Sequence, residues 1–253
     1  LPWHVPKKYF ELHPIEKIKL PKHQTNDIDD IPPGGRRMIG DAAKIIRESG
    51  KWREAVQGCL AAGSFADDCV GHVLSALNKS AYKDNTVVVL WGDHGYDICE
   101  KTFAKSALWQ QTTRTPLIIH VPEKLGGNKR NANCKKPVSL IDLYPTLIEL
   151  CGLPKNPKVE GRSIAPLVFD SQKEWPYPAL ITHSPHWHGP NHAVRSEQYH
   201  YIKYNGGGEE LYDMYNDSDQ LNNLANKKEF DLIKEELRKW MPKINTPHFR
   251  PKK

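Results

Sequence analysis

The stretch TVVVLWGDHGYD, residues 86–97, constrains the fold more than any other part of the chain. Its first six residues, Thr86 to Trp91, form a β-branched and apolar run with no polar alternation. Such a run predicts a strand that is buried on both faces, as in a parallel sheet covered by helices. The run ends in Gly92-Asp93-His94-Gly95, and α/β proteins bind their ligands at the carboxyl ends of such strands.

The neighbouring segments extend the same pattern. Apolar residues recur at helical spacing between Met38 and Asn78, and TPLIIHVP (115–122) predicts a second buried strand. SLIDLYPTLIELCGLP (139–154) predicts a helix with Ser139 as a possible N-cap, although Pro145 implies a kink or a later start. Alternating strands and helices predict an α/β sandwich.

The sequence changes character after Asp170. Short β-rich stretches lie within 178–184, 192–204 and 210–217, and Gly206-Gly207-Gly208 marks a turn. An amphipathic helix is expected at 227–242, with Phe230, Ile233, Leu237 and Trp240 on one face. We therefore predict two units, a larger one over 1–170 and a smaller sheet-plus-helix subdomain over 171–253. Residues 1–37 are rich in Pro, Lys and Asp, which predicts little regular structure.

Composition excludes some classes of protein. The chain has 253 residues, of which 38% are apolar, so it can bury a sizeable core. Lys and Arg exceed Asp and Glu by only 36 − 30 = 6, in small clusters, which disfavours nucleic acid and suits an anionic substrate. No apolar run reaches the length of a membrane span. The five cysteines form no C-x-x-C pair, and we expect mostly buried, free thiols.

Asp93 and His94 are the first candidate site residues. A carboxylate oxygen and a neutral imidazole nitrogen are both metal ligands, and the flanking Gly92 and Gly95 allow close approach. A solvated turn would use the same residue types. On chemistry alone, a metal site and a turn are equally good interpretations.

A resemblance favours the metal site. DNTVVVLWGDHGYDICEKTFAKSALWQQTTRTPLIIHVP (84–122) resembles the metal-site segment of the sulfatase family, in the alkaline-phosphatase-like superfamily, and most of all the branch that includes iduronate-2-sulfatase. Further family-like segments follow in the family's order: LPWHVPKKYFELHP, PVSLIDLYPTLIELCGLP, EGRSIAPLV, NHAVRSEQYHYIKY and EELYDMYND. The resemblance spans nearly the whole chain, from Leu1 to about Ala225.

The resemblance implies a fold and a reaction. The fold is a sandwich of helices around a mostly parallel sheet, and the reaction is hydrolysis of sulfate esters. The family's nucleophile is a formylglycine made from the Cys of a C-x-P-S-R segment, held with the sulfate by a divalent cation, usually Ca²⁺. At the matching positions, Asp93 and His94 would ligate the metal, and Lys105 would contact the sulfate as a fixed cation.

The loop between these residues departs from the family pattern. Relatives commonly read H-L-G-E-K where this chain has Asp97-Ile98-Cys99-Glu100-Lys101, and one residue is missing between Lys101 and Lys105. The alternative interpretation of Lys105, and of Lys101, is a solvated surface lysine. Cys99 is expected to replace a glycine rather than to bind metal.

The chain contains no C-x-P-S-R segment. Of the acidic pairs, Asp29-Asp30 lies in a Pro-rich loop and Asp67-Asp68 on a predicted helix, so both are expected to be surface charge. The chain opens where relatives read K-P-H-x-P-W. By resemblance this is the C-terminal portion of a sulfatase whose nucleophile lies in an N-terminal half, and the 253 residues alone are predicted to be inactive.

Weaker candidates lie in THSPHWHGPNH (182–192). His183, His186, His188 and His192 cluster there, but no i, i+4 pair places two of them on one helix face, so we expect a loop at the mouth of a pocket rather than a metal site. His192 and Arg195 could contact a substrate carboxylate or hydroxyl. An ordinary strand with a salt bridge fits them equally well.

Three functions remain open at this point. The first is a sulfatase acting on a sulfated carbohydrate. The second is a phosphatase or phosphodiesterase of the same superfamily, in which the Asp-His pair would bind Zn²⁺. The third is a non-catalytic protein that binds a sulfated glycan or a partner. The sequence selects neither the sulfate ester nor the cell compartment, although sulfatases are usually exported or lysosomal.

Overall fold

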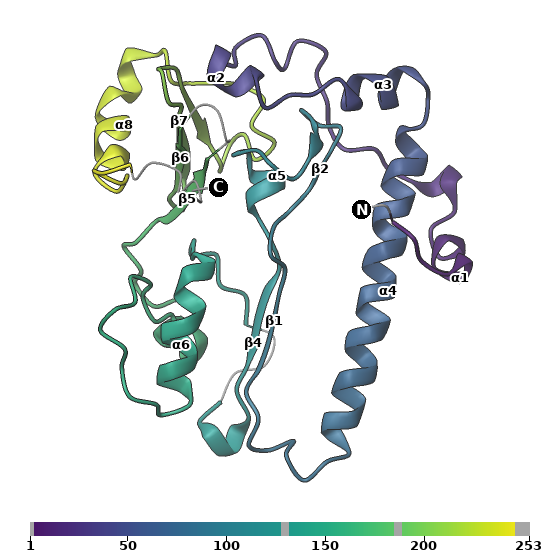
Figure 1. The fold of residues 1–253 in the computed structure, drawn as a ribbon, viewed down its shortest axis with the longest axis vertical. Helices are drawn as coiled ribbons and strands as arrows, with labels where there is room; N and C mark the ends of the chain where they lie inside the picture. The colour runs from purple at the N-terminus through teal and green to yellow at the C-terminus, as the bar shows by residue number, and fades with distance from the viewer. Residues whose placement is uncertain (1–2, 128–131, 185–188, 246–253) are drawn as a thin grey trace, which may run out of the picture.

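The computed structural model describes residues 3–127, 132–184 and 189–245. Within these ranges the strands form three antiparallel sheets, namely a β1–β4 ribbon, a β2–β3 hairpin and a four-stranded β5–β8 sheet. Figure 1 shows the four-stranded sheet at one end of the molecule and the long helix α4 running beside the ribbon. The fold is mixed α/β, with a small antiparallel sheet in its C-terminal part.

The four-stranded sheet is a meander in chain order. Its strands are β5 (Ala179–His183), β6 (Asn191–Arg195), β7 (Tyr199–Lys203) and β8 (Glu209–Asp213). The three glycines 206–208 lie between β7 and β8, and Tyr204 N donates to Gly208 O to close the turn. The predicted strands and turn of this region are confirmed.

This sheet is buried on both faces, because its side chains alternate between two apolar clusters. Ala193, Ile202 and Tyr212 face a cluster with Trp109 and Leu108. On the opposite face, Val194, Tyr201 and Leu211 pack against the C-terminal helix.

The C-terminal helix α8 (Asp231–Arg238) follows a 3₁₀ turn over Lys228–Phe230. Phe230, Ile233 and Leu237 pack against the sheet, as their spacing predicts, while Trp240 remains 39% exposed. Figure 1 shows α8 covering the outer face of the sheet. The helix is therefore an integral layer of the small C-terminal unit.

The ribbon corrects the prediction of a mostly parallel sheet. β1 (Val88–Trp91) and β4 (Leu117–His120) pair antiparallel, and Trp91 is 52% exposed. An apolar run indicates a strand that needs cover but not the direction of its neighbour. Here the chain returns from β1 through β2 (Asp97–Ile98), β3 (Phe103–Ala104) and the short helix α5 (Gln110–Thr113), with no long crossover helix among the described residues.

Residues 1–37 contain more helix than predicted. The predicted helical region 38–78 is divided into two helices. The N-terminal part contains these helical segments: α1 (Lys7–Glu11), a 3₁₀ turn (Ile15–Lys17), α2 (Pro33–Arg36), α3 (Ala42–Glu48) and α4 (Trp52–Asn78). A break around Gly50 separates α3 from α4, which packs against α1 and α3. Val73 on α4 is 69% exposed, so one apolar stripe of this helix has no cover among the described residues.

The segment 139–154 begins as a 3₁₀ turn (Leu140–Asp142) and continues as α6 (Leu143–Leu150). Ser139 forms the predicted N-cap as part of a capping box with Asp142. The α-helix starts two residues before Pro145, which confirms the later start. The other helical segments are a 3₁₀ turn (Glu123–Leu125) and α7 (Ala165–Phe169).

All five cysteines are free thiols, but only Cys99 is buried, so the prediction of mostly buried thiols is wrong. Cys69, for example, lies on the exposed side of α4 and faces solvent. Among the described residues, no helix combines the length and the apolar character that crossing a membrane requires.

Candidate functional site

The loop from Gly92 to Gly95 leaves β1 and packs tightly against the start of β4 and against α5. A Cβ added at Gly92 would lie 2.2 Å from Thr115 Oγ1, and one at Gly95 would lie 2.1 Å from Gln111 O. Larger residues therefore fit at neither position. The two glycines fix the path of the loop by close approach, as their positions predicted.

Between these glycines, Asp93 and His94 direct their polar atoms toward each other. His94 Nδ1 lies 2.7 Å from Gly95 O, and a carbonyl oxygen only accepts, so Nδ1 carries the proton. In the neutral ring, the lone pair then resides on Nε2, which lies 3.4 Å from Asp93 Oδ2. The Asp93 side chain is 86% exposed. The two ligand-type atoms thus lie close enough together for one cation to contact both.

This donor set fits part of a metal site. A backbone carbonyl holding the second ring nitrogen is the usual support of a metal-ligating histidine. Among the described residues, no group of three or more His, Cys, Asp or Glu side chains is placed to hold a metal ion. Asp93 and His94 are two donors, and a Ca²⁺ ion takes roughly six to eight oxygens, so further ligands would have to come from elsewhere.

The β2–β3 hairpin determines the position of Lys105. Asp97 pairs with Ala104 and Ile98 with Phe103, and Lys105 is the residue that directly follows β3. Along the chain, it therefore leaves the hairpin at the end where Tyr96 enters it. The Lys105 side chain is exposed. Whether it contacts a sulfate stays a prediction.

An aromatic cluster supports the same end of the hairpin. Trp3, from the N-terminal segment, lies edge-on to Tyr96 and to Phe103, with ring centroids 5.8 and 5.9 Å apart. The rings of Tyr96 and Phe103 are themselves 5.3 Å apart. Sequence reasoning did not identify this role of Trp3, because the contact joins residues about a hundred positions apart.

The tip of the hairpin is held by buried polar groups. Asp97 is fully buried and accepts hydrogen bonds from the backbone N–H groups of Lys101 and Thr102. Burial, followed by the nearby Glu100 carboxylate, raises the pKa of Asp97 to about 8. Arg47 and Trp52 donate to the carbonyls of Cys99 and Ile98. The tip is therefore tied to helices α3 and α4.

Cys99 occupies the tip with a φ of 71°, in the left-handed region that favours glycine. The side chain is fully buried, and burial raises the pKa of its thiol to about 12. A buried, protonated thiol is a poor metal ligand. The backbone angle agrees with the expectation that Cys99 stands where a glycine would be favoured.

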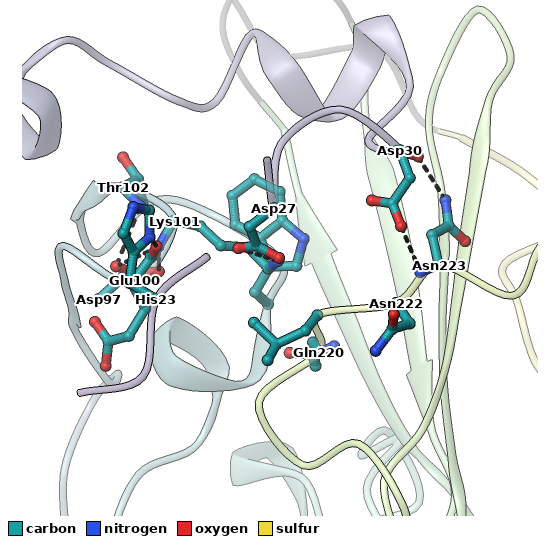
Figure 2. A network of polar contacts seen from close by, with 12 residues as sticks. His23, Asp27, Asp30, Asp97, Glu100, Lys101, Thr102, Gln220, Asn222 and Asn223 are labelled. Atoms are coloured by element: carbon teal, nitrogen blue, oxygen red, sulfur yellow. Dashed lines mark hydrogen bonds and ion pairs between the residues drawn. The ribbon is translucent and has the colours of Figure 1, made fainter. Parts of the chain in front are cut away.

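Lys101 is not the surface lysine that the sequence suggested. Its Nζ lies 2.7 Å from each carboxylate oxygen of Asp27, and the two side chains are 1% and 2% exposed (Figure 2). Burial raises the pKa of Asp27, while the Lys101 ammonium acts in the opposite direction. The pair occupies Lys101 fully, so it is not available to a substrate.

A second buried carboxylate continues this network. Glu210 on β8 accepts hydrogen bonds from Trp109 Nε1 at 2.8 Å and from the hydroxyls of Tyr204 and Tyr212 at 2.5 Å each. Lys101 Nζ lies 6.0 Å from the Trp109 ring centroid. The segment that follows Lys105 is thus anchored to the C-terminal sheet, and no local sequence signal indicated this.

The histidine-rich segment gives a different result. His186 and His188 lie outside the described residues. His192 is 8% exposed, and its two ring nitrogens bond Thr182 Oγ1 at 2.9 Å and Asn245 Oδ1 at 2.8 Å. Burial lowers the pKa of His183. Where the structure describes this segment, the imidazole of His192 already has partners on both sides.

Arg195 is also occupied by protein groups. It donates to the carbonyls of Ser196 and Glu197 and to Gln110 Oε1. The guanidinium therefore holds the turn after β6 against α5. Contacts of His192 or Arg195 with a substrate remain untested.

The two acidic pairs play structural roles. Asp30 accepts from Asn223 N at 2.7 Å, which ties the Pro-rich loop to the segment after β8 (Figure 2). Asp68 on α4 is paired with Lys8 and accepts from the Tyr9 hydroxyl. Asp68 is partly exposed, as expected of surface charge.

Two family models match the chain. A model described as "Sulfatase" matches residues 5–153, and one described as "N-sulphoglucosamine sulphohydrolase, C-terminal" matches residues 92–246. Each match covers more than half of the chain.

Individual relatives agree with these matches. A protein named "Sulfatase" from Formosa agariphila is 38% identical over 250 residues, which is 97% of this chain and 48% of the relative. An "Ulvan-active sulfatase" from the same organism is 29% identical over 73% of this chain and 37% of the relative. The solved structure of a 2-O GAG sulfatase superposes with a TM-score of 0.73 at 24% identity, covering 88% of this chain and 51% of that one. The chain thus spans about half or less of the length of these relatives.

Proposed function

Because the chain belongs to the sulfatase family, we propose that it is the C-terminal portion of a sulfuric ester hydrolase that acts on a sulfated carbohydrate. The names of two similar proteins, an ulvan-active sulfatase and a 2-O GAG sulfatase, support a polysaccharide substrate. The iduronate-2-sulfatase-like branch is part of this proposal. So is the division into the C-terminal part of the catalytic domain (1–170) and a small subdomain (171–253).

Asp93 and His94 would hold a divalent cation, with Ca²⁺ as the first candidate. The observation that carries this assignment is the convergence of His94 Nε2 and Asp93 Oδ2 at 3.4 Å, with His94 Nδ1 donating to Gly95 O. Such a cation, when bound, supplies positive charge that orients and neutralises sulfate oxygens. The packing of Gly92 and Gly95 keeps the two donors fixed.

Lys105 would bind the sulfate. Its exposed position directly after β3, in the hairpin that follows the Asp93-His94 loop along the chain, supports this assignment. A fixed cation there would stabilise negative charge that develops on the ester as the bond to sulfur breaks. Lys101, which is buried against Asp27, leaves Lys105 as the exposed cation of this hairpin.

The nucleophile is assigned to the other half of the protein. None of the five cysteines lies in a C-x-P-S-R segment, and the chain spans 48% of a similar sulfatase, so a formylglycine would come from a part of the protein outside these residues, which we propose is an N-terminal half. That half would also supply further metal ligands and would cover the exposed apolar face of β1, β4 and α4. We therefore expect no turnover from the 253 residues alone.

The proposal is tested by sulfate release from a sulfated polysaccharide and from a small aryl sulfate, with the full protein that contains these residues. Lys105→Ala is expected to lower kcat by at least about a hundredfold, because it removes a charge aimed at the reacting group. The matched control Lys83→Ala, an exposed lysine before β1, keeps wild-type kinetics. Equal activity of the Lys105 variant and the wild type contradicts the role of Lys105.

Metal analysis separates the sulfatase from its rival. We expect about one Ca²⁺ per chain, lost in Asp93→Asn together with His94→Ala. Stoichiometric zinc, with release of phosphate but not of sulfate, would favour a phosphatase or phosphodiesterase instead. Absence of both metal and turnover in the full protein would favour a non-catalytic glycan-binding role.

A further inference from the structure

An aromatic pocket lies at the end of the four-stranded sheet where β6 ends and β7 begins, and none of its lining residues belongs to the Gly92–Gly95 loop. It is an open depression of about 420 Å³, within the range of small-ligand sites. Five of its twelve lining residues are aromatic. These are Trp175, Tyr177, Tyr199, Tyr215 and Trp240. Neither the metal-binding loop nor the substrate-contact candidates account for this concentration of rings.

The rings are fixed in place before any ligand binds. Trp175 Nε1 donates to Pro137 O at 3.1 Å, and its ring lies edge-on to Tyr177 at 5.1 Å. Tyr177 in turn lies perpendicular to Trp240 at 6.0 Å. Prolines 176 and 178 restrict the backbone on either side of Tyr177. A rigid wall of this kind loses little conformational entropy when a ligand packs on it.

Two of these rings remain accessible. Tyr215 is 66% exposed and Trp240 is 39% exposed. Large aromatic side chains that gather at a concave exposed surface indicate a binding site. Apolar ring faces beside exposed polar groups suit a ligand that is itself half apolar and half polar.

Polar groups line the rest of the pocket. Ser196, Glu197 and Gln198 form the turn between β6 and β7, which Arg195 holds through two carbonyls. Gln198 Nε2 donates to Asp213 Oδ2 at 3.2 Å, and Glu197 is paired with Lys136. Hydroxyl, amide and carboxylate groups therefore face the same space as the rings and can exchange hydrogen bonds with a polyhydroxylated ligand.

A positively charged side chain, Arg162, lies at the edge of the aromatic cluster. The guanidinium of Arg162 stacks on Tyr177, with Cζ 4.5 Å from the ring centroid. The side chain is exposed, and within the described ranges it forms no ion pair with a carboxylate. Arginine presents paired donors that suit sulfate or carboxylate oxygens. The pocket thus offers flat apolar walls, hydrogen-bonding groups and one uncommitted positive charge.

We propose that this pocket is a second carbohydrate-binding site, which takes a sugar unit of the sulfated polysaccharide and places an anionic substituent against Arg162. The aromatic walls would pack on the C–H faces of the ring, while the turn 196–198 would bond its hydroxyls. The identification of the polysaccharide rests on the proposed function, but binding at the pocket does not depend on turnover.

The pocket is also linked to the candidate catalytic loop. Arg195 holds the pocket turn and donates to Gln110 on α5, and the backbone of that same helix packs against Gly95. A series of contacts through Arg195 and α5 therefore connects the pocket turn with the loop. A polymer long enough to reach both sites would remain tethered while its sulfate esters are processed.

The experiment measures binding of the full protein to heparin, chondroitin sulfate and ulvan, each beside its chemically desulfated form, by affinity electrophoresis. Trp240→Ala and Tyr215→Ala are expected to weaken binding of at least one polysaccharide by about tenfold, in its sulfated and desulfated forms. Arg162→Gln should weaken binding of the sulfated form alone, by about threefold to tenfold. The control Tyr82→Ala removes a ring that is likewise 66% exposed and leaves binding unchanged.

Kinetics distinguish this site from the catalytic one. The pocket variants should raise KM for the polysaccharide and leave kcat and KM for a small aryl sulfate unchanged. If the full protein releases no sulfate from any ester but Trp240→Ala still loses polysaccharide binding, the binding site is supported. That result would contradict only the proposed function. Wild-type binding by all three pocket variants, or binding of a proline-rich peptide in place of every polysaccharide, would overturn the inference.

Discussion

The two ends of the molecule bury their apolar residues to very different extents. In the four-stranded sheet, Ile202 is fully buried, and both faces are covered by protein. In the β1–β4 ribbon, Ile118 is 60% exposed, and the neighbouring helix α4 exposes Val73. The same residue types are thus packed at one end and open at the other.

The difference indicates which apolar surfaces are covered by other described residues of the same chain. The sheet receives its two covers from α8 and from the segment around Trp109, both within the described residues. The ribbon carries the loop of Asp93 and His94, and its apolar face has no such cover there. The candidate site therefore lies where the chain depends most on further structure, which agrees with a span of about half its relatives' length.

The largest loss of stability is expected from a substitution of Lys101, at the junction between the ribbon and the four-stranded sheet. Lys101→Met leaves the Asp27 carboxylate buried without its cation, which should lower the free energy of unfolding by about 3–5 kcal/mol. Chemical denaturation measures this loss. Lys105→Met, on the same hairpin but exposed, should change stability by less than about 0.5 kcal/mol.

A double variant checks the reason for that loss. Asp27→Leu combined with Lys101→Met removes both buried charges and should recover most of the stability, because no unpaired charge remains. If the double variant is as unstable as Lys101→Met alone, packing rather than charge explains the effect.

A matched pair of isoleucines measures the contrast directly. In the 253-residue chain, Ile202→Ala should cost about 2–5 kcal/mol, whereas Ile118→Ala should cost less than about 0.5 kcal/mol. In the full protein, the cost of Ile118→Ala should approach that of Ile202→Ala if the other half covers the ribbon. Thermal unfolding of both proteins provides the comparison, and an unchanged difference would contradict the proposed cover.

The packed end should also respond to acid. His200 is fully buried, and burial lowers the pKa of its imidazole from 6.5 to about 3. The folded state then binds fewer protons than the unfolded state between those pH values, so stability is present above pH 6.5 and is lost as pH falls. The slope that His200 contributes is about 1.4 kcal/mol per pH unit in this window, and it is measured as the difference between the wild type and a His200 variant, because the raised pKa of Asp97 contributes with the opposite sign.

Denaturation at several pH values checks the slope. His200→Asn should remove most of it, while His120→Asn, an exposed histidine on β4, should leave it intact. A wild-type slope in His200→Asn would assign the acid sensitivity to other groups.

The smallest effect is expected at the tip of the hairpin. Cys99→Gly relieves a left-handed backbone angle, which costs a non-glycine residue about 1–2 kcal/mol, but it also removes a buried side chain. The net change should remain below about 1 kcal/mol. Cys99→Val, a β-branched residue at a positive φ, should be clearly less stable than either, as differential scanning calorimetry would show.

The sequence predicted the local elements better than their arrangement. β-rich stretches and turn residues predicted the strands of the C-terminal sheet, because that information lies within each strand. The predicted mostly parallel sheet is not found among the described residues, where β1 and β4 pair antiparallel, because an apolar run does not encode the direction of its neighbour. Lys101 was mistaken for a surface residue, since its partner Asp27 lies 74 positions away.

The candidate site follows the same pattern. Asp93 and His94 were identified from chemistry and resemblance, and the roles of their flanking glycines follow from close packing. The support of the hairpin by Trp3, Asp97 and Glu210 was not identified. The contacts of Trp3 and Glu210 join distant segments, and no local pattern of residue types signals them, whereas those of Asp97 lie within the hairpin itself.

The bond between Trp109 and Glu210 also has a consequence during synthesis, because it joins residues 101 positions apart. At about 5–20 residues per second, the ribosome needs on the order of 5–20 s to extend the chain from one partner to the other. From the synthesis of β4 onward, the hairpin and the apolar ribbon exist without their anchor for the rest of that interval. The nascent chain therefore passes through a stage in which its most aggregation-prone strands are already made and the sheet that restrains them is not, and this is when a chaperone would have most effect.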